Sequence, residues 1–239
     1  GLVPTPRALE LAALVGGVTR QAAAALTPTA ALDLASLRRE FVMRVSDGFV
    51  ESFGPAIIDR VGREAPGVRL RFVQKADRDS KPLRDGAVDL ETGVVGPAAG
   101  PELRAQALFT DRFVAVVRPG GAYDVHALDL PGYLAARHVG VSRLPGGGGP
   151  VDEALQRLGA RRDIAVSVSG YSAALALVRA ADLVATVPEK HTAGLRDGLR
   201  RVALPFSVAE ITISLIWHPR MNADPAHRWL RAQVRCACA

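Results

Sequence analysis

Apolar residues recur in short runs separated by turn-forming residues, and this pattern predicts a regular order of strands and helices. Strands are expected at 41–45, 68–73, 88–96, 108–117, 138–142, 164–168, 183–188, 202–204 and 211–217. Helices are expected at 49–61, 82–85, 151–158, 172–180, 189–195 and 225–235. Because strands that alternate with helices usually form parallel sheets with crossover helices, the pattern predicts an α/β fold.

Turn-rich breaks near 118–121 and 218–224 divide this pattern into two α/β units of similar size. The last helix has no strand of its own, so we expect it to pack back on the first unit. The expected subdomains are 39–118 with 219–239, and 119–218, each Rossmann-like and joined by two crossover segments. Ligands of open α/β sheets bind beyond the carboxyl ends of the strands, which predicts a ligand cleft between the units.

The N-terminal residues predict one long helix over 8–26, which Thr5 can cap and Pro6 can begin. A short heptad seam runs along it, formed by Leu11, Val15, Val18, Ala22 and Ala25. The helix either pairs with a second copy of the chain or packs on its own domain. Residues 1–38 are therefore expected to hold a linker helix and a linker, and pairing would give a homodimer or homotetramer.

The composition is 49% hydrophobic and 23% charged, which fits a globular chain and excludes a disordered one. The net charge is +6, but the basic residues are scattered, so most are expected on the solvated surface. Cys236 and Cys238 have no metal-ligand spacing, and we expect free thiols with no metal and no cofactor. No apolar run approaches the roughly 18 residues that span a membrane, and no signal peptide is recognisable, which favours a cytoplasmic location.

Several segments, in their order and spacing, resemble LysR-type transcriptional regulators over nearly the whole chain. They are residues 2–8, Ser46-Asp47, 64–70 with 83–90, 108–114, and 217–220 with 224–230. The resemblance implies a linker helix followed by a periplasmic-binding-protein-like effector domain that senses a small molecule, controls transcription and oligomerises. The last two segments are similar to a branch that senses small aromatic compounds, so an aromatic or organic-acid effector is expected. The chain departs from the family at Thr92, where an apolar residue is usual. It also lacks the winged helix-turn-helix expected before Leu2, the part through which such a protein would contact operator DNA.

Candidate effector contacts follow from strand ends and from the resemblance. Ser46 ends the first strand and is the leading candidate, although it or Asp47 could simply cap the next helix. The remaining candidates also lie at strand ends or strand-to-helix turns, and they are Gly96, Pro97, Ser142, Arg143, Tyr171, Ser172 and Thr186. Arg143 could pair with an anionic effector or remain a solvated residue at the rim. Tyr171 could stack on a ring or simply pack.

Two other functions are compatible with parts of the sequence. Residues 170–174 are similar to the turn that presents a nucleophilic serine in hydrolases, with Ser172 as nucleophile, His191, His218 or His227 as base, and Asp182 to orient it. The last position is Ala174 rather than the usual glycine, and such partners are common by chance. The second alternative is a soluble binding protein without a regulatory role, which would need no N-terminal helix. We expect a regulator's sensing domain and no enzyme activity.

Overall fold

The computed structural model describes residues 5, 7, 11, 15, 32–75, 79–96, 102–142 and 149–239. The chain divides into two units, residues 1–34 and 35–239. In the first unit Arg7, Leu11 and Val15 are helical, as the sequence predicts. The other residues of the predicted linker helix, including Val18, Ala22 and Ala25, lie outside the described residues, so its pairing stays a prediction.

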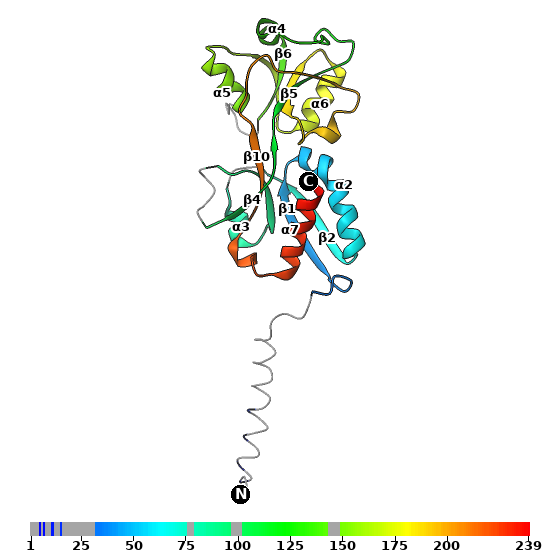
Figure 1. Cartoon of the computed structure of the whole chain (residues 1–239), viewed down its shortest axis with the longest axis vertical. Helices are drawn as coiled ribbons and strands as arrows, with labels where there is room; N and C mark the ends of the chain where they lie inside the picture. Colours follow the sequence, from blue (N-terminus) through cyan, green and yellow to red (C-terminus); the bar gives the residue numbers. More distant parts are fainter. Residues whose placement is uncertain are drawn as a thin grey trace. The chain divides into compact units, whose positions relative to one another are not determined.

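The second unit contains two five-stranded sheets, which we call the sheets of lobe I and lobe II (Figure 1). The lobe I sheet has the strand order β2-β1-β3-β10-β4. Its strands are β1 (Arg39–Val45), β2 (Val68–Gln74), β3 (Leu90–Val94), β4 (Arg104–Asp111) and β10 (Ile211–Trp217). Strand β1 is parallel to β2 and β3, whereas β10 is antiparallel to β3 and β4.

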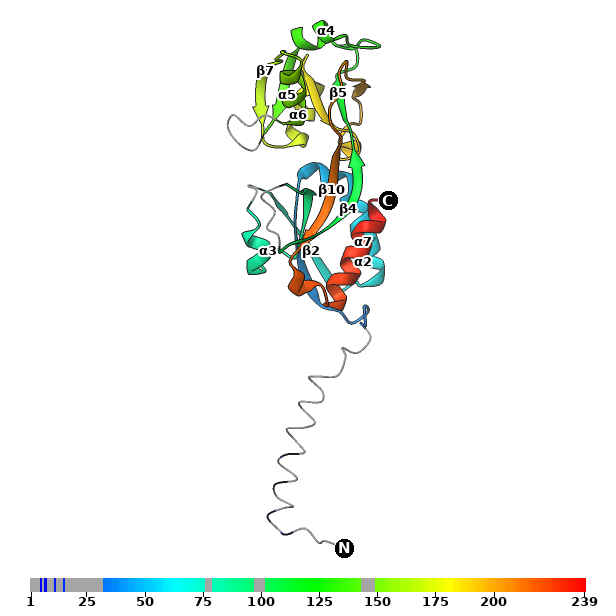
Figure 2. The ribbon, with the colours of Figure 1, turned by 60° about the vertical axis from the view of Figure 1, so that its left-hand side comes forward.

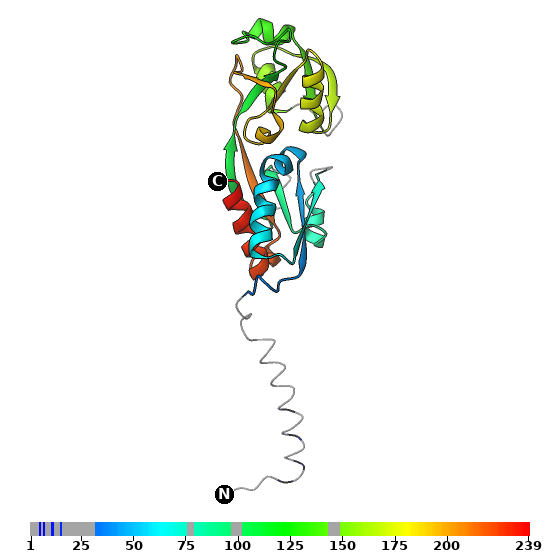
Figure 3. The ribbon, with the colours of Figure 1, turned by 90° about the vertical axis from the view of Figure 1, so that its right-hand side faces the viewer.

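Helices cover both faces of the lobe I sheet (Figure 2). Helices α2 (Asp47–Glu64) and α7 (Pro225–Ala237) lie side by side on one face, and α3 (Lys81–Asp85) lies on the other (Figures 2 and 3). Phe49, Ile57 and Val61 of α2 are buried, because their spacing puts them on one side of the helix. Ile58, expected on the same side, is 54% exposed.

The lobe II sheet has the order β7-β6-β8-β5-β9. Its strands are β5 (Phe113–Val117), β6 (Arg137–Val141), β7 (Asp163–Val168), β8 (Val184–Pro188) and β9 (Arg200–Val202). Helix α6 (Tyr171–Ala180) packs against one face, and α4 (Leu130–Ala135) and α5 (Pro150–Arg157) pack against the other. Two short 3₁₀ helices, η1 (Ala193–Leu195) and η2 (Pro219–Met221), complete the described elements.

The α/β fold is confirmed, but the expectation of parallel sheets was only partly right, because β10 and β5 run antiparallel to their neighbours. The single strand expected over 108–117 was wrong. It is divided at Arg112 into β4 of lobe I and β5 of lobe II. Helix α4 was not expected, and the helix expected over 189–195 is reduced to η1.

The subdomain boundaries stay a prediction, but two strands lie in a different sheet from the one that these boundaries imply. Strand β5 falls inside the predicted first subdomain but belongs to the lobe II sheet, and β10 shows the reverse. We therefore propose that the chain crosses between lobes at Arg112 and within residues 203–210.

Candidate functional site

The carboxyl ends of strands from both lobes meet where α2 begins. Ser46 follows β1 and caps α2, because its Oγ accepts a hydrogen bond from the N–H of Phe49 at 3.2 Å. The same Oγ is hydrogen-bonded to Nε2 of His191, which follows β8 of lobe II. A single hydroxyl thus joins the start of α2 to the other lobe, and we call this region the lobe junction.

His191 is held in place through its backbone and is 6% exposed. Asp111, at the end of β4, accepts hydrogen bonds from the N–H groups of Lys190 and His191, both at 2.8 Å. Aromatic rings surround the imidazole, with centroid distances of 6.1 Å to Phe49, 6.4 Å to Phe109 and 5.9 Å to Tyr171. The junction therefore combines hydrogen-bonding groups with aromatic walls.

Further polar contacts connect α2 to lobe II. The N–H of Ser172 donates to Asp47 Oδ2 at 2.9 Å, and its hydroxyl donates to Glu51. Ser52 Oγ donates to the carbonyl of His191 at 3.2 Å and accepts from the N–H of Gly194 at 3.1 Å. The first two turns of α2 thus contact both the start of α6 and the segment after β8.

Four of the candidates named from the sequence lie at this junction, namely Ser46, Asp47, Tyr171 and Ser172. His191 was considered only as a possible catalytic base. The sequence held one signal that could have identified His191 as a candidate effector contact, namely its position just beyond the carboxyl end of a strand.

Three of the other candidates are described by the structure, and two lie outside the described residues. Thr186 is buried and hydrogen-bonded to the hydroxyl of Tyr133 at 2.7 Å. Ser142 follows β6, and its N–H donates to Val168 at 2.9 Å. Gly96 is exposed two residues after β3. Pro97 and Arg143 are outside the described residues.

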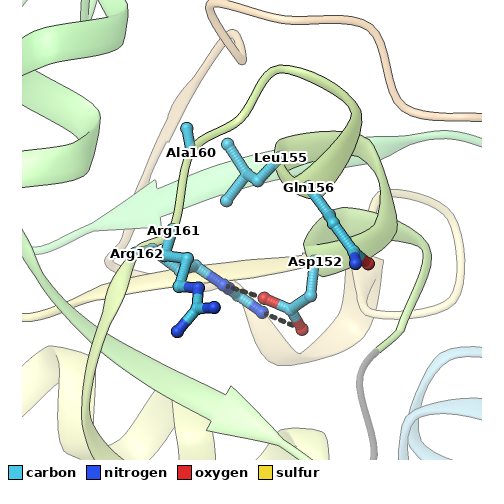
Figure 4. Close-up of a pocket in the computed structure, with 6 residues that line it drawn as sticks. All are labelled: Asp152, Leu155, Gln156, Ala160, Arg161 and Arg162. Atoms are coloured by element: carbon cyan, nitrogen blue, oxygen red, sulfur yellow. Dashed lines mark hydrogen bonds and ion pairs between the residues drawn. The ribbon is translucent and has the colours of Figure 1, made fainter.

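A cavity of about 350 Å³ lies beside α5, within lobe II (Figure 4). Its lining residues are Asp152, Leu155, Gln156, Ala160, Arg161 and Arg162. Arg162 makes two hydrogen bonds to Asp152, at 2.7 and 3.0 Å. Burial raises the pKa of Asp152, but the hydrogen bond and charge of Arg162 outweigh this, so its pKa lies below the usual value. The charges of Arg162 and Asp152 are therefore already paired with each other.

Among the described residues, no cluster of His, Cys, Asp and Glu is arranged to hold a metal ion. None of the helices in the described part of the chain is long and apolar enough to cross a bilayer.

Comparison with known proteins gives consistent matches. The family model of the LysR substrate binding domain matches residues 35–239. The chain is 30% identical over 238 residues to the HTH-type transcriptional activator NagR of a Ralstonia species, covering 97% of this chain and 77% of NagR. It is 29% identical over 234 residues to the activator NahR of Pseudomonas putida, covering 97% of this chain and 78% of NahR.

Solved structures give the same result for the fold. A probable transcriptional regulator from Pseudomonas aeruginosa superposes with a TM-score of 0.76 at 30% identity, covering 97% of this chain and 78% of that chain. The regulatory domain of MexT, an activator from the same species, gives 0.72 at 24% identity, covering 85% of this chain and all of that domain. The periplasmic-binding-protein-like fold expected from the resemblance is confirmed.

Proposed function

The chain belongs to the LysR family and carries its substrate-binding domain, the ligand-sensing part of a transcriptional regulator, and from that premise we propose that its effector binds at the lobe junction. The contact between Ser46 and His191 carries the proposal, because it places hydrogen-bonding groups of both lobes inside a ring of aromatic side chains. Ligand sites usually combine apolar walls with a few convergent polar groups.

The proposed effector is a small aromatic compound or organic acid. Tyr171, which is half-buried, offers a ring to a planar molecule, and the buried rings of Phe49 and Phe109 support the His191 imidazole from behind. Ser46 and His191 offer hydrogen bonds that fix the orientation of the molecule. Asp47 and Ser172 lie beside them, and Gly96, Pro97, Ser142 and Arg143 are proposed as rim residues. Thr186 is not included, because its hydroxyl bonds to Tyr133.

A thermal-shift screen tests the proposal. Small aromatic acids, phenols and aliphatic carboxylates are added to the chain, and each hit is repeated with Ser46→Ala. A compound that binds only the folded state raises the melting temperature, and a hit at 100 times its Kd adds about 2.7 kcal/mol of stability. We expect the shift to shrink in Ser46→Ala and to stay in Ser167→Ala, whose serine is exposed on β7.

Two outcomes of the screen count against the proposal in different ways. A hit that shifts Ser46→Ala as much as the parent chain excludes Ser46 as an effector contact. The absence of any hit across the three compound classes contradicts the proposed effector chemistry.

The wider role is that of an oligomer that responds to its effector. We propose that the linker helix pairs chains into a homodimer or homotetramer in the cytoplasm, and that effector binding changes their packing. A structural relative, CbnR, has been solved in complex with its target DNA. Operator contact is proposed to run through a winged helix-turn-helix on the N-terminal side, as in that family.

The two other functions considered from the sequence have less support. The Ser-His hydrolase considered from the sequence requires the Ser172 hydroxyl to contact a histidine, whereas this hydroxyl donates to Glu51. We therefore propose no catalytic role, and ester turnover that disappears in Ser172→Ala would contradict this. A binding protein without a regulatory role would not explain the similarity to regulators over 97% of the chain.

A further inference from the structure

Helix α6 begins without a cap from its own segment. Its N-cap residue, Gly170, has an extended backbone with φ −143° and ψ 159° and has no side chain to accept a hydrogen bond. The first N–H groups of a helix have no partner within the helix, so they need one from elsewhere.

Asp47 of lobe I supplies this partner across the lobe junction. Its Oδ2 accepts a hydrogen bond from the N–H of Ser172 at 2.9 Å, and the nearby Glu51 accepts one from the Ser172 hydroxyl. Asp47 is available for this because Ser46 already caps α2. A carboxylate is also favoured at this position by the partial positive charge of the helix N-terminus.

Two glycines make the close approach of the lobes possible. A Cβ atom at Gly170 would lie 2.4 Å from Asp47 Oδ2, and one at Gly48 would lie 2.7 Å from the carbonyl oxygen of His191. Neither glycine has a positive φ. The space between the lobes, and not the backbone conformation, therefore excludes a side chain at both positions.

We propose that Asp47 is a positioning residue that caps α6 from the other lobe, and that this cross-lobe clasp (Asp47, Gly170 and Ser172) sets the separation of the lobes. The second oxygen, Asp47 Oδ1, is buried and has no hydrogen-bond partner among the described residues. Burying an unsatisfied acceptor costs free energy, which offsets part of the stabilisation from the Ser172 hydrogen bond. The closed arrangement is therefore only slightly favoured, and the clasp can open. Its regulatory meaning rests on the proposed function, since an effector bound between the lobes would shift this equilibrium.

Interlobe distances measured by pulsed electron paramagnetic resonance test the clasp. Cys236 is exposed on α7 of lobe I, whereas Cys238 is buried and burial raises its pKa to about 12, so a thiol-reactive spin label attaches to Cys236. Glu153→Cys places the second label on the exposed face of α5 in lobe II. Dilution with unlabelled chain removes distances between subunits.

Two variants distinguish an effect on the separation of the lobes from an effect on the stability of α6. Asp47→Ala removes the cap, and we expect a longer, broader interlobe distance and about fivefold faster exchange of the Ser172 amide. Gly170→Ser gives α6 a cap of its own and fills the space of the Asp47 carboxylate. We therefore expect the same longer distance, while the amides in the first turn of α6 stay protected.

Asp129→Ala is the matched control, because Asp129 caps α4 within lobe II through the N–H of Gly132 at 2.8 Å. Its interlobe distance should equal that of the parent. The proposal is overturned if Asp47→Ala and Gly170→Ser both keep the parent distance, or if Asp129→Ala shifts it equally. Because the distance measurement uses no effector, its failure would not contradict the proposed function. Likewise, a failed effector screen would not contradict the clasp.

Discussion

Ser46 shows what a single residue's place in the sequence can and cannot reveal. The sequence left open whether Ser46 or Asp47 caps α2. The structure shows that Ser46 does, while the Asp47 carboxylate reaches lobe II. The position of Ser46 at a strand end was enough to select it as a candidate, and its role as an effector contact stays a prediction. The contact between Ser46 and His191 was not predictable, because the two residues are 145 positions apart and the contact depends on how two sheets are placed.

The buried hydroxyl of Thr92 on β3 gives a second prediction about a single residue. The resemblance to LysR-type regulators implies an apolar residue there. The threonine is 4% exposed, and its hydroxyl is buried without a hydrogen-bond partner in the described part of the chain. Thr92→Val keeps the shape and removes the unsatisfied hydroxyl, so we expect the free energy of unfolding to rise by about 1 kcal/mol in urea denaturation.

Thr212→Val, at an exposed position on the neighbouring strand β10, is the control, and a change below about 0.5 kcal/mol is expected. A loss of stability in Thr92→Val would mean that the hydroxyl is satisfied, and would contradict this account of the residue.

Among the elements, α7 is fixed to lobe I by a buried histidine. His227 Nδ1 accepts a hydrogen bond from the Arg231 guanidinium at 2.6 Å, and its other nitrogen, Nε2, bonds to the carbonyl of Asp89 at 3.0 Å. Arginine can only donate, so Nδ1 carries no proton and Nε2 donates. The packing of α7 therefore requires neutral His227.

This requirement predicts acid sensitivity. Burial, together with the charge of Arg231, lowers the pKa of His227 below its usual value. The unfolded chain binds a proton near pH 6.5 and the folded chain does not, so stability falls as the pH drops below about 6.5. We expect the urea midpoint to fall between pH 7.5 and 5, and His227→Gln to lose part of that dependence.

His138 is also buried with a lowered pKa, so the substitution should remove only part of the slope. His126→Gln, at an exposed position, serves as the control and should keep the slope of the parent. Equal slopes in the parent and in His227→Gln would show that α7 docks without a neutral imidazole.

The elements that sequence patterns missed have identifiable causes. Residues 108–117 contain no glycine or proline, and the polar stretch 110–112 is too short to mark the passage from β4 to β5 at Arg112. Helix α4 has only six residues and contains Pro131 and Gly132, so it gives no clear helical pattern. The pair Asp129 and Pro131 could have identified it, since an aspartate cap followed by proline is typical of a helix start.

At the scale of the whole molecule, the rule that ligands bind beyond strand ends located part of the candidate site. Ser46, Asp47, Tyr171 and Ser172 come from different lobes and meet at one junction. The same rule selected Thr186, but a strand end does not reveal which face of the sheet a side chain lies on. The side chain of Thr186 lies on the face that packs against Tyr133 of α4.

The central claim is that the effector binds at the lobe junction. Hydrogen–deuterium exchange, measured with and without a compound found in the thermal-shift screen, tests this claim most directly. The account predicts slower exchange at residues 46–52, 170–173 and 189–194, which form the junction. The cavity beside α5 is the internal comparison, and residues 152–162 should exchange unchanged. Protection confined to 152–162, with none at the junction, would place the effector in lobe II alone and contradict the account.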